Sequence, residues 1–202
     1  KGFPGRIDLA YSVCHKCSHL FATESPDPET LDVIYRDLYM THLSKDGIFC
    51  RAYEDRFVRL FQKFVKEVLV PESGTLLEIG CSDANILLQM QELGYEVTGC
   101  EPSSQAQYGL REGLQIVQDF FSSAHFPHTR FDLVYSRQVL EHIAQPVDFL
   151  LQIKQVLTDS GQNYYGNPLG RISPCRRFNQ PFSRGAFGHL HCSFHTIRPN
   201  AG

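Results

Sequence analysis

A chain of 202 residues, 42% hydrophobic and 20% charged, has the composition of a soluble globular protein with one main domain and a small appendage. Its formal net charge of -3 gives no overall reason to bind nucleic acid or an anionic membrane, since both select a positive excess. No apolar run approaches the roughly 20 residues that cross a bilayer, and seven cysteines are an odd number, so we expect a cytoplasmic protein with reduced thiols.

The first segment with a clear pattern is residues 11–21, YSVCHKCSHLF, which indicates two short extended pieces around a Cys-x-x-Cys turn. Cys14 and Cys17 at this spacing can present two thiolates to one tetrahedral zinc ion. A redox-active pair is the alternative, although no strand and helix of the thioredoxin type surround it. One pair is half of a zinc site, so we predict a partial zinc-knuckle-like module over residues 1–24.

Residues 25–73 are predicted to be a linker and a helical segment. The Pro-rich stretch ESPDPET opens this segment, and Tyr35 and Tyr39 follow it at helical spacing. Residues 54–69 then carry apolar side chains at i, i+3, i+4 and i+7, which is the stripe of an amphipathic helix.

From residue 75 onward, short apolar strands alternate with helices. Strands are predicted over 75–79, 95–100, 115–117, 131–135 and 161–168, and helices over 85–93, 103–112 and 147–157. This alternation is typical of βαβ units. We therefore predict an α/β fold over residues 74–168, a Rossmann-like, doubly wound and mostly parallel sheet with helices on both faces. Right-handed crossovers place the carboxyl ends of the strands on one edge, where a ligand is expected.

Residues 169–202 show no further strand and helix pattern and are predicted to be an irregular tail. No acidic residue occurs from residue 160 to the end, whereas arginine occurs at positions 171, 176, 177, 184 and 198. These arginines either bind an anionic acceptor group or belong to an irregular end of the chain.

The predicted carboxyl edge carries groups that suit a nucleotide-like cofactor. Glu78 ends the first strand, and Gly80 allows a sharp turn without a Cβ atom. Glu101, followed by Pro102, ends the second strand, where a carboxylate can accept hydrogen bonds from both ribose hydroxyls. The turn after the first strand stays thin because its other residues are small, namely Cys81, Ser82 and Ala84.

Asp119 and Phe120 follow the third strand. They can accept a hydrogen bond from an adenine amino group and cover the face of the ring. The alternative is that they are a loop acid and a core aromatic residue.

Two stretches resemble class I S-adenosylmethionine-dependent methyltransferases. The run EIGCSDANILL is similar to EIGSNDG-LL, the variant of the first motif in sugar C-methyltransferases, with Asp83 at the motif's Asp and Ser82 and Ala84 at general glycine positions. Residues 131–143, FDLVYSRQVLEHI, resemble the fourth-strand segment FDxIxxxxVLEHI. The resemblance implies S-adenosylmethionine as cofactor, a small-molecule acceptor such as a sugar or sugar nucleotide, and Ser136 among the cofactor-binding residues. The antiparallel strand pair that closes the family's sheet is expected to be missing.

The same resemblance implies three catalytic candidates, His142, His189 and Tyr39. His142 follows the fourth strand, where it is either a base or a helix-start residue that bonds local backbone. His189, in FGHLHCSF, resembles an aromatic-Glu-His motif near the catalytic centre of sugar C-methyltransferases, with Gly188 at the Glu position, or else it is a solvated tail residue. Tyr39 is an acceptor-side residue or a packing residue.

Two other functions stay open. A nicotinamide-dependent oxidoreductase also fits a parallel sheet with an acid after the second strand, but the G-x-G-x-x-G pattern is missing. A non-catalytic remnant of this fold, or a zinc-dependent interaction module, would account for the replaced glycines. The leading hypothesis is methyl transfer to a small molecule, with the oligomeric state left open.

Overall fold

A computed structural model of the chain describes residues 10–38 except 17, 19 and 25, single residues 59, 61 and 63, residues 73–166, and the backbone of 172–175. Three predicted site residues, Cys17, Tyr39 and His189, lie outside the described residues. Most of the helix predicted over 54–69 lies outside them as well.

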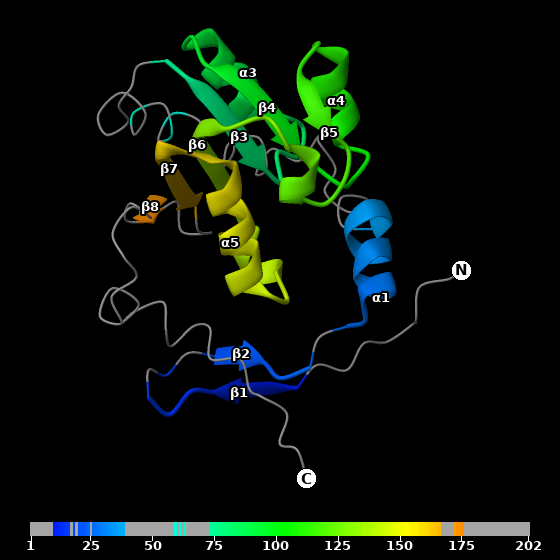
Figure 1. Ribbon diagram of the computed structural model, residues 1–202. Helices are drawn as coiled ribbons and strands as arrows, with labels where there is room; N and C mark the ends of the chain where they lie inside the picture. The colour runs from blue at the N-terminus through cyan, green and yellow to red at the C-terminus, as the bar shows by residue number, and fades with distance from the viewer. Residues whose placement is uncertain are drawn as a thin grey trace.

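Two sheets are present in the described part of the chain (Figure 1). The first is an antiparallel hairpin of β1 (Tyr11–Val13) and β2 (Leu20–Ala22). The second has six strands in the order β5-β4-β3-β6-β7-β8. Its strands are β3 (Thr75–Ile79), β4 (Glu96–Cys100), β5 (Gln115–Val117), β6 (Phe131–Arg137), β7 (Leu157–Gly166) and β8 (Ile172–Cys175).

The helices are α1 (Pro28–Val33), continued by the π-helical segment η1 (Ile34–Leu38), α3 (Asn85–Glu92), α4 (Ala106–Arg111) and α5 (Pro146–Val156), with 3-10 turns η2 (Ser123–His125) and η3 (Leu140–His142). Every pair of strands in the large sheet is parallel except β7 with β8. The first strand, β3, lies between β4 and β6, which is the doubly wound arrangement that the sequence predicts.

Alternate side chains of the parallel strands point to opposite faces of the sheet and pack into two apolar cores, one on each face. One core joins α3 to the sheet through residues such as Leu76, Leu87, Met90, Val97 and Tyr135. The other joins α5 to the sheet through residues such as Leu77, Val134, Phe149, Ile153 and Val156. Both faces are therefore covered, as a parallel sheet requires, and the free edge at the carboxyl ends is left for a site.

Phe61 is one of the described residues of the predicted amphipathic helix. It is helical and fully buried, and its ring packs against that of Tyr135 with centroids 4.5 Å apart. This burial agrees with the apolar stripe from which the helix over 54–69 is predicted.

Strand β7 begins at Leu157, four residues before the predicted strand, and two further elements lie in stretches where none is predicted. A helix begins inside the stretch expected to be a linker, because the Asp27 carboxylate accepts from the Thr30 amide at 2.9 Å and Pro28 occupies the first helical turn. Strand β8 lies in the segment predicted to be irregular, where it pairs with β7. Within the described part of the chain, no helix is both long and apolar enough to span a membrane.

Candidate cofactor-binding site

Three parallel strands end together at the edge where a ligand is expected. Ile79 pairs with Cys100 on one side and with Ser136 on the other, so β3, β4 and β6 end at the same level. The Gly80 amide then donates to the Cys100 carbonyl at 2.8 Å, which extends the ladder by one residue. The groups predicted after these strands are therefore neighbours.

The turn after β3 has a left-handed backbone at each glycine position of the family motif. Gly80 has φ +73°, and a Cβ atom there would lie 2.6 Å from Cγ2 of Val139. Ser82 and Ala84 have φ +51° and +62°, a region that residues with a side chain rarely adopt. The turn therefore keeps its shape although two of its glycines are replaced.

Glu101 ties this turn to the end of β4. Its Oε2 accepts from the Ser82 amide at 3.0 Å and its Oε1 accepts from the Ser103 amide at 2.8 Å, while its side chain is 8% exposed. Asp83, which follows Ser82, and Pro102, which follows Glu101, are both half-buried. The carboxylate is thus fixed at the edge by two backbone donors.

Glu78 lies on the same face of the sheet as Glu101. It pairs with Gly99, and Glu101 is two residues beyond that partner, which preserves the face. Both carboxylates affect the same thiol: burial raises the pKa of Cys81 far above its ordinary value, and the charges of Glu78 and then Glu101 raise it further. The two acids that the sequence singles out therefore meet at one side of the sheet.

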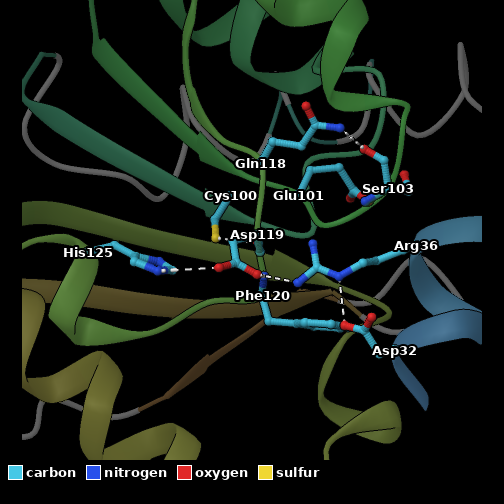
Figure 2. Close-up of polar contacts among 9 residues, drawn as sticks. All are labelled: Asp32, Arg36, Cys100, Glu101, Ser103, Gln118, Asp119, Phe120 and His125. Carbon is cyan, nitrogen blue, oxygen red and sulfur yellow. Dashed lines mark hydrogen bonds and ion pairs between the residues drawn. The ribbon is translucent and has the colours of Figure 1, made fainter. Parts of the chain in front are cut away.

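Asp119, after β5, is held by several polar neighbours (Figure 2). Its Oδ1 accepts from Arg36 Nη2 at 2.5 Å and from the Phe120 amide at 2.8 Å, and its Oδ2 lies 3.7 Å from Nε2 of His125. Its carbonyl accepts from the Cys100 thiol at 3.1 Å. The Arg36 hydrogen bond is the main reason why the pKa of the Asp119 carboxyl is lowered.

Arg36 reaches this position from η1, 83 residues earlier in the chain. Its Nε donates to Asp32 one turn before it at 2.6 Å, and its guanidinium lies 4.9 Å from the centre of the Phe120 ring. Figure 2 shows the guanidinium beside the Asp119 carboxylate and over the Phe120 ring. The i, i+4 spacing of Asp32 and Arg36 is readable from sequence, but their contact with the β5 loop is not.

An aromatic group borders the same region. The Tyr35 ring meets the Phe120 ring edge-on with centroids 6.3 Å apart, and meets the His142 ring with centroids 5.6 Å apart. His142 is exposed at the end of η3, and its amide donates to the Val139 carbonyl at 2.9 Å. Tyr35 therefore contacts both His142, the predicted base, and Phe120, which is predicted to cover the adenine ring.

Ser136 lies near the carboxyl end of β6 and is 1% exposed. Its Oγ has no hydrogen-bond partner within the described part of the chain. A buried hydroxyl in this state is uncommon in folded proteins and is expected of a group that a ligand or ordered water satisfies.

Cys14 follows β1 in the hairpin turn, where its carbonyl accepts from the Ser18 amide at 2.7 Å. Among the residues that the structure describes, no group of three or more His, Cys, Asp or Glu side chains could hold a metal ion. The described part of the predicted zinc module therefore gives no support for a complete site.

Comparison with known proteins shows the family to which the chain belongs. A family model described as a methyltransferase domain matches residues 49–198. The ubiquinone biosynthesis O-methyltransferase of Nitrosococcus oceani is 28% identical over 98 residues, which are 45% of this chain and 42% of that protein. The enzyme of the same name from Caulobacter vibrioides is 30% identical over 101 residues, 45% of this chain and 39% of that one.

A solved structure of similar fold is a TehB-like SAM-dependent methyltransferase from Corynebacterium glutamicum. It is 17% identical, with a TM-score of 0.45 over 58% of this chain and 69% of that one. Because the family model covers more than half of the chain, the chain belongs to the methyltransferase-domain family, whose class I members use S-adenosylmethionine. The chain spans about two fifths of the length of the curated relatives named above.

Proposed function

We propose that the protein transfers a methyl group from S-adenosylmethionine to a small-molecule acceptor. The observation that carries this proposal is the position of Glu101, whose carboxylate is fixed by the Ser82 and Ser103 amides where β3 and β4 end. A carboxylate oxygen has two acceptor sites, so each oxygen of Glu101 can still accept a ribose hydroxyl.

The described residues fit this cofactor. The buried Oγ of Ser136 offers a hydrogen bond that no described protein group takes up. The turn from Gly80 to Ala84 has the left-handed backbone that the glycine-rich motif requires, although Ser82 carries a side chain. We therefore assign cofactor binding to Glu101 and Pro102, to Asp119 and Phe120, and to the residues Glu78, Gly80, Cys81, Ser82, Asp83 and Ser136.

S-adenosylmethionine supplies a methyl group that is already activated as a sulfonium. The protein has to hold the donor, align the acceptor and, for a hydroxyl acceptor, remove a proton. We assign proton removal to His142, which is exposed at the carboxyl edge beside Tyr35. We assign supporting roles on the acceptor side to His189 and Tyr39, which lie outside the described residues.

Two observations narrow the proposed methyl acceptor, namely a sequence motif and the names of the curated relatives. The EIGCSDANILL motif favours a sugar or sugar nucleotide. The names of the curated relatives favour an oxygen acceptor of the kind met in ubiquinone biosynthesis. We expect a small-molecule acceptor, and from the net charge of -3 no nucleic-acid or membrane partner.

The organisation of the chain also stays a proposal. We assign cofactor binding to residues 74–168 and half of a zinc site to Cys14 and Cys17, whose other ligands would come from outside the hairpin. Buried thiols such as Cys81 and Cys100, which form no disulfide, support a reducing compartment such as the cytoplasm.

Calorimetric titration with S-adenosylhomocysteine and, separately, with NADH tests the function. We expect the first ligand to bind and the second not to bind. Glu101→Gln removes a charge-assisted acceptor, so this variant should bind at least about tenfold more weakly. Glu96→Gln, at the exposed start of the same strand, is the matched control and should bind as the unchanged protein does.

Two outcomes would contradict the proposal. Binding of NADH alone would favour a nicotinamide-dependent oxidoreductase. Binding of neither ligand by a cooperatively folded protein would favour a non-catalytic remnant of the fold.

A further inference from the structure

We propose that the guanidinium of Arg36 is a built-in competitor of the cofactor's adenine ring. This inference rests on the proposed function, because it concerns the same site. Arg36 occupies both groups that are assigned to adenine, the Asp119 carboxylate and the face of Phe120. An adenine ring that takes Oδ1 of Asp119 and the face of Phe120 then has to displace Arg36, which loosens the helical segment that carries it from the edge of the sheet.

The chemistry of the two groups explains the competition. A guanidinium is planar, donates N–H hydrogen bonds in its own plane and stacks on aromatic faces. An adenine ring is also planar, donates through its exocyclic amino group and stacks on aromatic side chains. Arg36 contacts both groups at once, with Nη2 on Oδ1 of Asp119 and with Cζ over the Phe120 ring, 4.9 Å from its centroid.

Both acceptor positions of Asp119 Oδ1, the oxygen that faces Arg36, are taken. Oδ1 accepts from both Arg36 and the Phe120 amide, which fills its two acceptor positions. Oδ2 lies toward His125, at 3.7 Å. An amino group that approaches Oδ1 therefore has to replace the guanidinium.

The position of Arg36 is set by its own helical segment. Asp32 holds Nε at 2.6 Å, so the side chain is directed toward the β5 loop and keeps only 33% of its surface exposed. The neighbouring residue Tyr35 contacts His142. A shift of this segment on cofactor binding would therefore also change the contact of Tyr35 with His142, the proposed base, and so couple donor binding to the acceptor side.

Titration of S-adenosylhomocysteine into three variants tests this inference. Arg36→Met removes the planar donor, so we expect affinity to rise about five- to tenfold, the range of a partly exposed ion pair plus a cation–π contact. Arg36→Lys keeps the charge without the planar fork and should give an intermediate gain. Arg111→Met is the matched control, because Arg111 stacks on Tyr108 at 5.9 Å away from these groups, and its affinity should not change.

Salt dependence of the unchanged protein gives a second measurement, with Arg36→Met as its comparison. S-adenosylhomocysteine carries no net charge at neutral pH, whereas salt weakens the pair of Arg36 and Asp119. Affinity of the unchanged protein should therefore rise with salt, and that of Arg36→Met should stay constant.

The outcomes separate this inference from the function on which it rests. If the unchanged protein binds and Arg36→Met binds equally or more weakly, the competitor role is wrong and methyl transfer stands. If affinity falls with salt, the competitor role is also wrong. If neither the unchanged protein nor Arg36→Met binds S-adenosylhomocysteine, both proposals fail.

Discussion

At the scale of single residues, the turn after β3 carries backbone strain that glycine would avoid. Ser82 has φ +51° and is half-buried, while its amide is bound by Glu101. Ser82→Gly removes a cost of about 1–2 kcal/mol and keeps that hydrogen bond, but it adds flexibility to the unfolded chain. We expect a net gain of about 0.5–1 kcal/mol in the free energy of unfolding, measured with urea.

The matched control is Ser104→Gly, the same exchange at an exposed loop residue that is absent from the positive-φ positions. It should lower the free energy of unfolding by about 0.5 kcal/mol, because only the unfolded state gains freedom. Equal effects of the two exchanges would show that the left-handed backbone at Ser82 stores no strain.

Local signals in the sequence are sufficient for part of the site. Glu78, Gly80 and Glu101 stand at strand ends, and the structure brings them together at one edge, although their roles in binding stay predictions. Arg36 is different, because its partner Asp119 is 83 residues away. Helical spacing indicates a pair with Asp32 and carries no information on the loop that this arginine meets.

At the scale of elements, helix α4 packs closely on the sheet because it carries Gly109, although glycine has a low helix propensity. A Cβ atom at Gly109 would lie 2.4 Å from Cδ1 of Ile116 and 2.6 Å from Cβ of Ala84. Gly109→Ala gains about 1 kcal/mol in propensity but forces the helix away from the sheet, which costs about 1–3 kcal/mol.

We therefore expect Gly109→Ala to lower the free energy of unfolding by about 1 kcal/mol, measured by denaturant titration. Gln107→Ala, on the exposed face of the same helix, should change it by less than about 0.5 kcal/mol. A more stable Gly109→Ala protein would mean that α4 can move away from the sheet at little cost.

The quality of the element predictions follows the strength of the local pattern. Strand β5 agrees with the prediction at both ends, and β3 does too, because short apolar runs between turn residues mark them. Helix α1 does not stand out in the sequence because Pro28 is typical of a linker, whereas Asp27 before it makes a cap. Strand β8 cannot be predicted from its sequence, ISPC, which has no alternating apolar pattern, although its backbone pairs with β7.

At the scale of the whole molecule, Asp132 joins three strands at the end of the sheet opposite the site. Its Oδ2 accepts from the Thr75 amide and hydroxyl, both at 3.0 Å, and its Oδ1 accepts from the Thr158 hydroxyl at 3.2 Å. The Thr75 amide is the main cause that lowers the pKa of this carboxyl below its ordinary value.

A lowered folded-state pKa contributes stability above the unfolded value of about 3.9, and this contribution is lost as pH falls through the folded value. The melting temperature should therefore drop below about pH 4. Asp132→Asn should have a lower melting temperature at neutral pH, and its melting temperature should fall less on acidification. The control is Asp148→Asn, which is exposed in the first turn of α5 and should keep the steep fall of the melting temperature below about pH 4. The same dependence of the melting temperature on pH in both variants would contradict the role of Asp132.

The two thiols beneath the site have a consequence for chemical labelling. Burial raises the pKa of Cys100 to about 12 and that of Cys81 further, so neither forms the thiolate that alkylating reagents attack. We expect neither thiol to react with iodoacetamide while β3 and β4 remain paired. The rate of alkylation at Cys81 and Cys100, measured by peptide mass spectrometry, therefore reports how often the central strands β3 and β4 open.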